Sequence, residues 1–111
     1  MPVLKLPGLS ASVNVASIIY VEGSINYAWL HTTNQPKCLV AVTLKGVHAQ
    51  LPGFIRIHKS WLINPAHVAQ VSLEGSRCIA IQLTNGNRMV VARRRMEKVR
   101  QQLEKLVQLL D

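Results

Sequence analysis

The sequence is poor in acidic residues. Five Asp and Glu stand against 13 Lys and Arg, so the 111-residue chain carries a formal net charge of +8. In so small a chain this excess favours a polyanionic partner, nucleic acid or an anionic membrane surface, over a merely basic surface. The few carboxylates form no spaced pair, and neither a G-x-S-x-G motif nor a Gly-rich phosphate loop is present. We therefore expect no enzyme active site.

Aromatic residues are also scarce, with two Trp, two Tyr and one Phe. Binding of RNA or single-stranded DNA by a small β-barrel is the main alternative, and it requires exposed aromatic rings interleaved with cations. Phe54 and Trp61 lie in an apolar stretch that we expect to be buried. Their burial would count against this alternative.

Patterns that bind metals, form disulfides or enter membranes are missing as well. Cys38 and Cys78 have no C-x-x-C partner, and we interpret them as core thiols of a cytoplasmic protein rather than as a redox pair. The four His residues lack the spacing of a metal site, so no cofactor is expected. No apolar run approaches the roughly 20 residues that cross a bilayer. The whole chain, residues 1–111, is expected to fold as a single domain.

Short β-rich segments separated by turn signals fill most of the chain. Helical spacing between Leu44 and Leu51 predicts one short helix that ends at Pro52. The sequence Thr-Asn-Gly-Asn at residues 84–87 is typical of a type I′ hairpin turn. The fold class is therefore mostly β, with about seven short strands. These are expected within residues 12–22, 27–33, 37–43, 54–63, 67–73, 77–83 and 88–92.

Residues 54–63 combine dense apolar character with four polar side chains. The apolar residues predict one mostly buried strand. Burying Arg56, His58, Lys59 and Ser60 without partners would cost about 1–3 kcal/mol for each neutral group and more for each charge. We therefore expect these groups at a surface. On a regular strand Lys59 faces away from the other three, so all four reach one ligand only if the strand ends near His58. Whether His58 makes a structural hydrogen bond or a DNA contact is left open.

The C-terminal segment has a different pattern. Residues of about 94–110 are strong helix formers without Gly or Pro. Their apolar residues repeat at the spacing of a coiled-coil seam, at Met96, Val99, Leu103, Leu106 and Leu110. This helix can lie on the β body, form a homodimer contact, or serve a protein-interaction module.

A cluster of cations spans the junction between the last strand and this helix, with six in 13 residues: Arg88, Arg93, Arg94, Arg95, Lys98 and Arg100. The planar fork of arginine suits bidentate contact with phosphate or with guanine O6 and N7. Nucleic-acid contact is therefore favoured over a solvated surface. The turn at residues 23–27, with Ser24 and Asn26, would on its own be an ordinary hairpin tip.

Four sequence blocks resemble the LytTR family of bacterial DNA-binding domains. FIRIHKSWLIN at residues 54–64 is similar to the family pattern F-x-R-I-H-R-S followed by an aromatic, two aliphatic residues and Asn. The other blocks are IIYVE with Asn26-Tyr27, Thr43-Leu44, and VARR at residues 91–94. Their order along residues 16–103 matches that of the family. Two positions depart from it, because Ala92 replaces a common Ser and Arg95 replaces a common aromatic residue.

The resemblance implies an elongated stack of small antiparallel sheets with one short internal helix and a C-terminal amphipathic helix. It also implies loops that enter successive major grooves of double-stranded DNA. Base-reading positions would correspond to the turn 24–28, to Lys59 beside Ser60, and to Arg93 with Arg94. The full set of expected DNA contacts is Ser24, Asn26, Tyr27, Arg56, His58, Lys59, Ser60, Arg88, Arg93, Arg94 and Arg95.

Family members commonly act as transcription regulators, often as the output domain of a response regulator. The resemblance thus implies sequence-specific DNA binding by a cytoplasmic bacterial regulator with no membrane partner. At 111 residues the chain has no room for a receiver domain, so it is either a stand-alone regulator or a piece of a longer one. A homodimer, or two copies side by side on repeated DNA sites, is compatible with the sequence.

Overall fold

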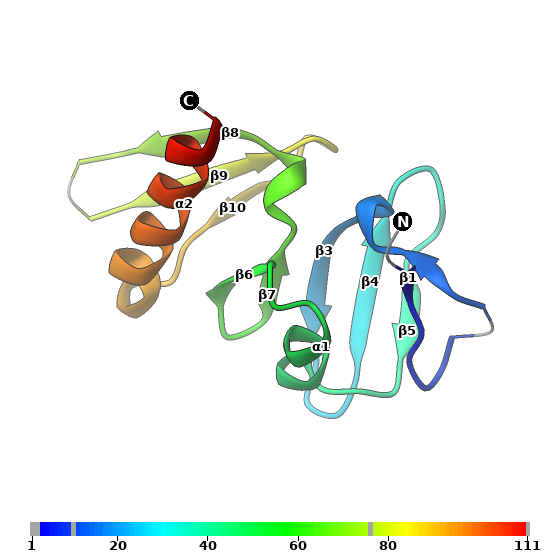
Figure 1. Ribbon diagram of the computed structural model, residues 1–111. Coiled ribbons are helices and arrows are strands. Elements are labelled where there is room, and N and C mark those ends of the chain that lie inside the picture. Colours follow the sequence, from blue (N-terminus) through cyan, green and yellow to red (C-terminus); the bar gives the residue numbers. More distant parts are fainter. Residues whose placement is uncertain (1–2, 10, 76, 111) are drawn as a thin grey trace.

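The computed structural model describes residues 3–9, 11–75 and 77–110, and the side chains among them up to residue 105. Its dimensions are 43 × 31 × 23 Å, and three antiparallel sheets and two α-helices build it (Figure 1). The expected elongated, mostly β stack is confirmed. No helix in the described residues is long and apolar enough to cross a membrane.

The described residues form ten short strands instead of the roughly seven expected from turn signals. In order the elements are β1 (Val3–Leu4), β2 (Val13–Asn14), β3 (Ile18–Gly23), β4 (Ala28–Thr32), β5 (Cys38–Val40), α1 (Leu44–Gln50), β6 (Ile55–His58), β7 (Trp61–Ile63), β8 (Val68–Leu73), β9 (Ile79–Leu83), β10 (Arg88–Val90) and α2 (Met96–Leu110). Three short 3-10 turns, η1 (Val15–Ser17), η2 (Pro65–His67) and η3 (Arg93–Arg95), connect them.

A five-stranded sheet in the order β5-β4-β3-β7-β6 forms the centre of the molecule. One face packs against α1 and β1 in a first core that includes Val21, Leu30, Val47 and Leu62, each fully buried. Thr43 caps the N-terminus of α1, because its side chain accepts a hydrogen bond from the Gly46 N–H (3.1 Å).

A second core joins this sheet to the three-stranded sheet β10-β9-β8 and to α2. Met96 and Val99 of α2 are buried in it, and Leu103 packs against it. The helix therefore lies on the β body, as one of the alternatives predicted. The side chains of Leu106 and Leu110, also part of the expected seam, lie outside the described residues.

The stretch 54–63 is a hairpin, and the prediction of one continuous strand is wrong. In β6 and β7, Ile55 pairs with Ile63, and after a shift in register His58 pairs with Trp61. The chain reverses at Lys59 and Ser60, at the point where the family resemblance implied a loop. Trp61 is consequently only partly buried, unlike Phe54, which is 4% exposed.

The hairpin between β9 and β10 is confirmed, but its turn is not type I′. That turn needs positive φ at both central residues, and Asn34 is the only non-glycine with positive φ in the described residues. Instead the Gly86 N–H bonds to the Leu83 carbonyl (2.9 Å), with Gly86 at φ +90°. This is a type I turn followed by a left-handed glycine, the common three-residue connection.

Candidate nucleic-acid interface

Three turns that the sequence singled out lie in a row, joined by two backbone hydrogen bonds. The Gly23 N–H, at the root of the β3–β4 tip, bonds to the Ser60 carbonyl in the β6–β7 turn (2.8 Å). The Ala92 N–H, just before η3, bonds to the Ile57 carbonyl on the other side of that turn (2.8 Å). All three turns lie on the lower side of the molecule in Figure 1. The β6–β7 turn is therefore the middle member of a fixed row.

Arg56 holds the middle turn in shape. Its Nε donates to the His58 carbonyl (2.7 Å) and its Nη2 to the Lys59 carbonyl (2.6 Å). Burial, and secondly the nearby charge of Arg95, lower the pKa of Arg56. The Lys59 side chain, by contrast, is exposed at the tip. Of the two cations in this hairpin, Lys59 projects to solvent whereas Arg56 is turned back onto the protein.

His58 also bonds within the turn. Its Nδ1 accepts a hydrogen bond from the Ser60 N–H (3.1 Å), and its ring stacks on Trp61 with centroids 4.5 Å apart. Burial lowers the pKa of His58, and the charges of Lys59, Arg95 and Arg56 lower it further. The neutral ring, whose Nδ1 can accept the hydrogen bond from the Ser60 N–H, is thus favoured. This geometry supplies the structural hydrogen bond that the sequence left open.

The cations of η3 project from a backbone that is anchored on both sides. The Val91 N–H bonds to the Ile79 carbonyl (2.9 Å) and Ala92 to β6, while Met96 is buried directly after the turn. Ala92 makes no side-chain cap. Arg93 and Arg94 are exposed, whereas Arg95 is half-buried beside the β6–β7 turn.

The β3–β4 tip carries short polar groups and an aromatic ring. The Ser24 N–H bonds to the Tyr27 carbonyl (2.8 Å), which closes the tip. Ser24 and Asn26 are exposed. Tyr27, 41% exposed, meets the Trp29 ring edge-on with centroids 6.4 Å apart.

A partly buried aromatic residue on β4, Trp29, was not identified from the sequence as part of this region. Lys37 Nζ lies 4.6 Å from the Trp29 ring centroid, a cation–π contact that joins β4 to the segment before β5. Only the spacing of Tyr27 and Trp29, two residues apart where an extended strand begins, could have indicated it.

Arg88, another expected contact, is not brought into the row. It lies on β10, where its Nη2 bonds to Glu74 Oε1 (2.6 Å), so its charge is paired with a carboxylate. A solvent-exposed pair of this kind contributes little to stability. It does reduce the positive charge available for a partner at this point.

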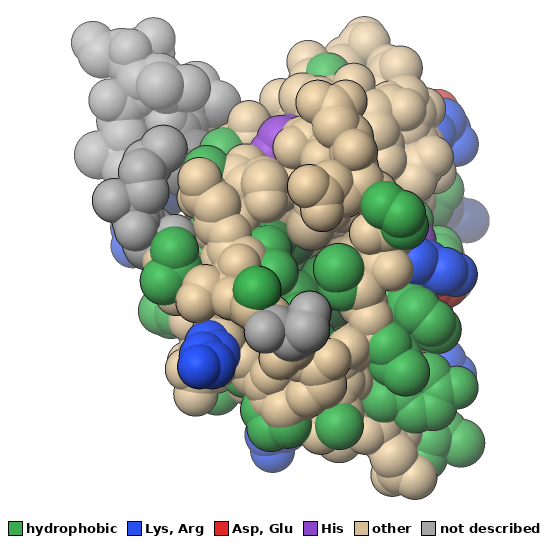
Figure 2. Space-filling view, turned by 90° about the vertical axis from the view of Figure 1, so that its right-hand side faces the viewer, with side chains coloured by type: hydrophobic (Ala, Val, Ile, Leu, Met, Phe, Trp, Pro, Cys, Tyr) green, Lys and Arg blue, Asp and Glu red, His purple; other side chains and the backbone are tan. Residues whose placement is uncertain are grey.

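Positive charge is unevenly spread over the surface. Arg95 lowers the pKa of both Arg56 and His58, which shows that cations crowd together at the middle turn. Figure 2, a view of the side that bears β1 and β5, shows few Lys and Arg side chains, most of them toward the margins. The row of turns is thus a place where cations gather.

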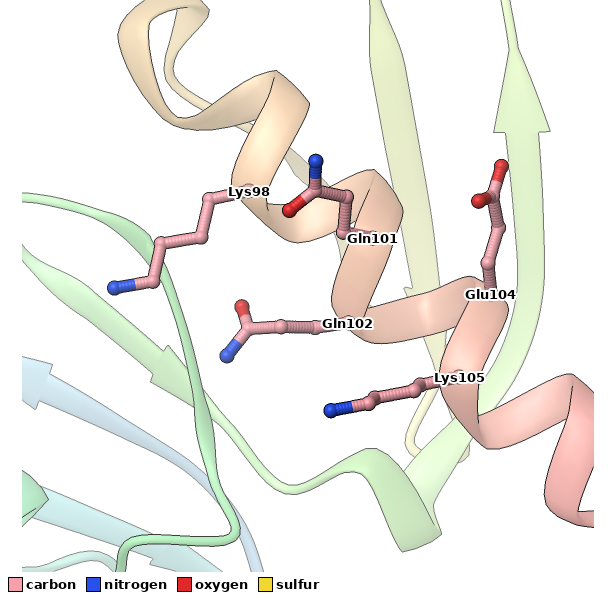
Figure 3. A pocket seen from close by; sticks show the side chains of 5 residues that line it. All are labelled: Lys98, Gln101, Gln102, Glu104 and Lys105. Atoms are coloured by element: carbon pink, nitrogen blue, oxygen red, sulfur yellow. The ribbon is translucent and has the colours of Figure 1, made fainter.

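The α2 surface adds a shallow polar hollow of about 380 Å³, lined by Lys98, Gln101, Gln102, Glu104 and Lys105. Lys98, Gln102 and Lys105 extend to the same side of the helix (Figure 3). The hollow lacks the apolar walls of a small-molecule site. Within the described residues no three His, Cys, Asp or Glu side chains are grouped to hold a metal ion.

Comparison with known proteins identifies the fold and the family. The family model of the LytTr DNA-binding domain matches residues 10–104. A solved LytTr DNA-binding domain from Bacillus cereus is 19% identical, with a TM-score of 0.78 over 91% of this chain and 95% of that one. A search of curated proteins returned no match. Because the family model spans most of its length, the chain belongs to the LytTr DNA-binding domain family.

Proposed function

We propose that this DNA-binding domain recognises specific duplex sequences by inserting its three linked turns into major grooves, and that it acts in transcription regulation. The observation that carries the proposal is the pair of backbone hydrogen bonds, Gly23 to Ser60 and Ala92 to Ile57. They fix the spacing between the turns, and fixed spacing is what allows several contacts to form on one duplex without a further cost of ordering.

The side chains divide by their geometry. Lys59, Arg93 and Arg94 project freely and are assigned to base edges or phosphates, since Arg and Lys on guanine O6 and N7 are the commonest specific contacts. The exposed polar groups of the β3–β4 tip, Ser24 and Asn26, together with Tyr27, form the third contact region.

Five other residues are assigned supporting or minor roles. Arg56 and His58 hold the middle turn through their hydrogen bonds, and Ser60 connects it to β3. Arg95 lies half-buried among these cations and is assigned to the phosphate backbone. Arg88 is assigned a minor part because Glu74 pairs with it.

A binding comparison tests the proposal. A duplex selected from a random pool should bind more tightly than unrelated duplex, and both more tightly than single-stranded DNA or RNA of the same sequence. Binding should weaken with salt, with a slope of log K against log[salt] of about −5 to −7 for six to eight phosphate contacts. Preference for single strands would instead favour a stacking mode on Tyr27 and Trp29, and a slope shallower than about −2 would remove the electrostatic argument.

Binding of two copies side by side on repeated DNA sites, or as a homodimer, is a separate proposal. Light scattering of the free protein and the stoichiometry of its complex with a duplex holding one or two selected sites test it. One copy per single site and two per double site, from a monomeric protein, would favour side-by-side binding.

A further inference from the structure

An aliphatic side chain stands at the tip of the β3–β4 hairpin. Ile25 is 86% exposed, more than any other large hydrophobic residue in the described part of the chain. The last strand pair is Gly23 with Ala28, and the Ser24 N–H bonds to the Tyr27 carbonyl (2.8 Å). Ile25 therefore occupies one of only two positions at the turn.

The root of this tip is fixed from two directions. The Gly23 N–H bonds to the Ser60 carbonyl, and a Cβ on Gly23 would lie 2.8 Å from the Leu44 Cβ, so the strand end is packed closely against α1. Isoleucine is also β-branched and stiff about χ1. The position of Ile25 relative to the Lys59 turn is thereby set before any ligand arrives.

The surroundings of Ile25 indicate what it contacts. A single exposed hydrophobic residue is ordinary on a protein surface. Ile25, however, lies at the tip of the hairpin, and its neighbours in the chain, Ser24 and Asn26, are polar. Both of these neighbours are exposed, and the nearest exposed apolar side chain along the chain is that of Tyr27, at 41%. An aliphatic group can neither donate nor accept a hydrogen bond. At the base edges of the major groove the only apolar group is the C5-methyl of thymine.

We infer that Ile25 packs against a thymine methyl group and selects thymine at one position of the site. The inference rests on the proposed insertion of the β3–β4 tip into a major groove, and it adds a residue that reads by shape rather than by hydrogen bonding. Thymine and uracil present the same hydrogen-bonding edge. Only the methyl contact distinguishes them.

The test replaces each thymine of the selected duplex by deoxyuridine, one at a time, and measures the dissociation constant. One replacement should weaken wild-type binding about fourfold, equivalent to about 0.8 kcal/mol for one buried methyl group. Ile25→Ser should bind the parent duplex more weakly and lose the uracil penalty at that position, whereas Ile25→Val should keep it. Leu73→Ser removes another exposed aliphatic side chain, 65% exposed on β8, and should leave every uracil penalty unchanged.

Site-preferring binding without a uracil penalty at any position, or with equal penalties in wild type and Ile25→Ser, would overturn this inference alone. A protein that does not prefer any duplex site would overturn the proposed function with it. Thermal melts of the variants check folding, and the exposed side chain of Ile25 should make Ile25→Ser melt within a few degrees of wild type, as surface changes of about 0.5 kcal/mol do.

Discussion

Arg56 offers the sharpest separation between a residue that touches DNA and one that shapes the turn. Its guanidinium donates to two carbonyls, those of His58 and Lys59, at 2.7 and 2.6 Å. Hydrogen bonds with a charged partner each contribute about 1.5–3 kcal/mol. Because the side chain is partly exposed, we expect Arg56→Lys to lose about 2–3 kcal/mol of unfolding free energy in total. A lysine keeps the charge, but its single ammonium cannot reproduce the fork.

Thermal unfolding and duplex binding of Arg56→Lys and Arg56→Met measure the effect. If Arg56 positions the turn, both variants should melt about 8–12 °C lower than wild type, and both should lose preference for the selected site. If Arg56 instead contacts phosphate, Arg56→Lys should behave like wild type, and only Arg56→Met should lower the salt slope by about 1. A lysine variant with wild-type stability and specificity would refute the positioning argument.

Three further predictions concern the same row of turns. Arg93→Ala should lose affinity for the selected duplex and reduce the preference for that duplex over random DNA by about 1–3 kcal/mol. Arg95→Ala should instead weaken binding to the selected duplex and to random DNA by a similar factor, and lower the salt slope by about 1. Competition binding of the two variants measures this, and identical behaviour would contradict the assignment. Burial and neighbouring cations lower the pKa of His58 below 6.5, so its stabilising effect is complete above pH 6.5 and is lost as the pH falls through the lowered pKa. The unfolding free energy from urea titrations between pH 5.5 and pH 7.5 should therefore depend more steeply on pH in wild type than in His58→Gln. Parallel pH dependences would remove His58 as the cause. Trp61→Ala removes a partly buried ring stacked on His58, so it should lower the unfolding free energy by about 2–3 kcal/mol. Truncation of a fully buried aromatic residue costs more, roughly 3–5 kcal/mol. Calorimetry showing no change would mean that the stack contributes nothing to stability.

Much of the fold followed from local patterns in the sequence. The helix α1 between Thr43 and Pro52 and the hairpins β3–β4 and β9–β10 rest on periodicity and turn residues, which act over short distances. These features were predicted because their causes lie within a few residues of one another.

The features that were missed depend on contacts between distant residues or on side-chain geometry. The residue pattern alone hid the reversal at Lys59, which only the family resemblance implied, because β-branched and aromatic residues continue on both sides of it. The Arg56 fork that stabilises the reversal leaves no periodic signal. The pairing of Arg88 with Glu74 spans 14 residues of sequence. The sequence pattern therefore did not reveal this ion pair, and Arg88 was interpreted as an unpaired cation. The row of turns itself depends on the Gly23–Ser60 hydrogen bond, which only the tertiary structure reveals.

The central claim is that the three linked turns read major grooves. Methylation interference on the selected duplex tests it most directly, because the guanine N7 lies in the major groove and the adenine N3 in the minor groove. We predict that methylated guanine N7 blocks binding in clusters about one helical turn apart, 10–10.5 base pairs, while methylated adenine N3 has little effect. Interference only from methylated adenine N3, or no interference from any methylated guanine N7, would contradict the account.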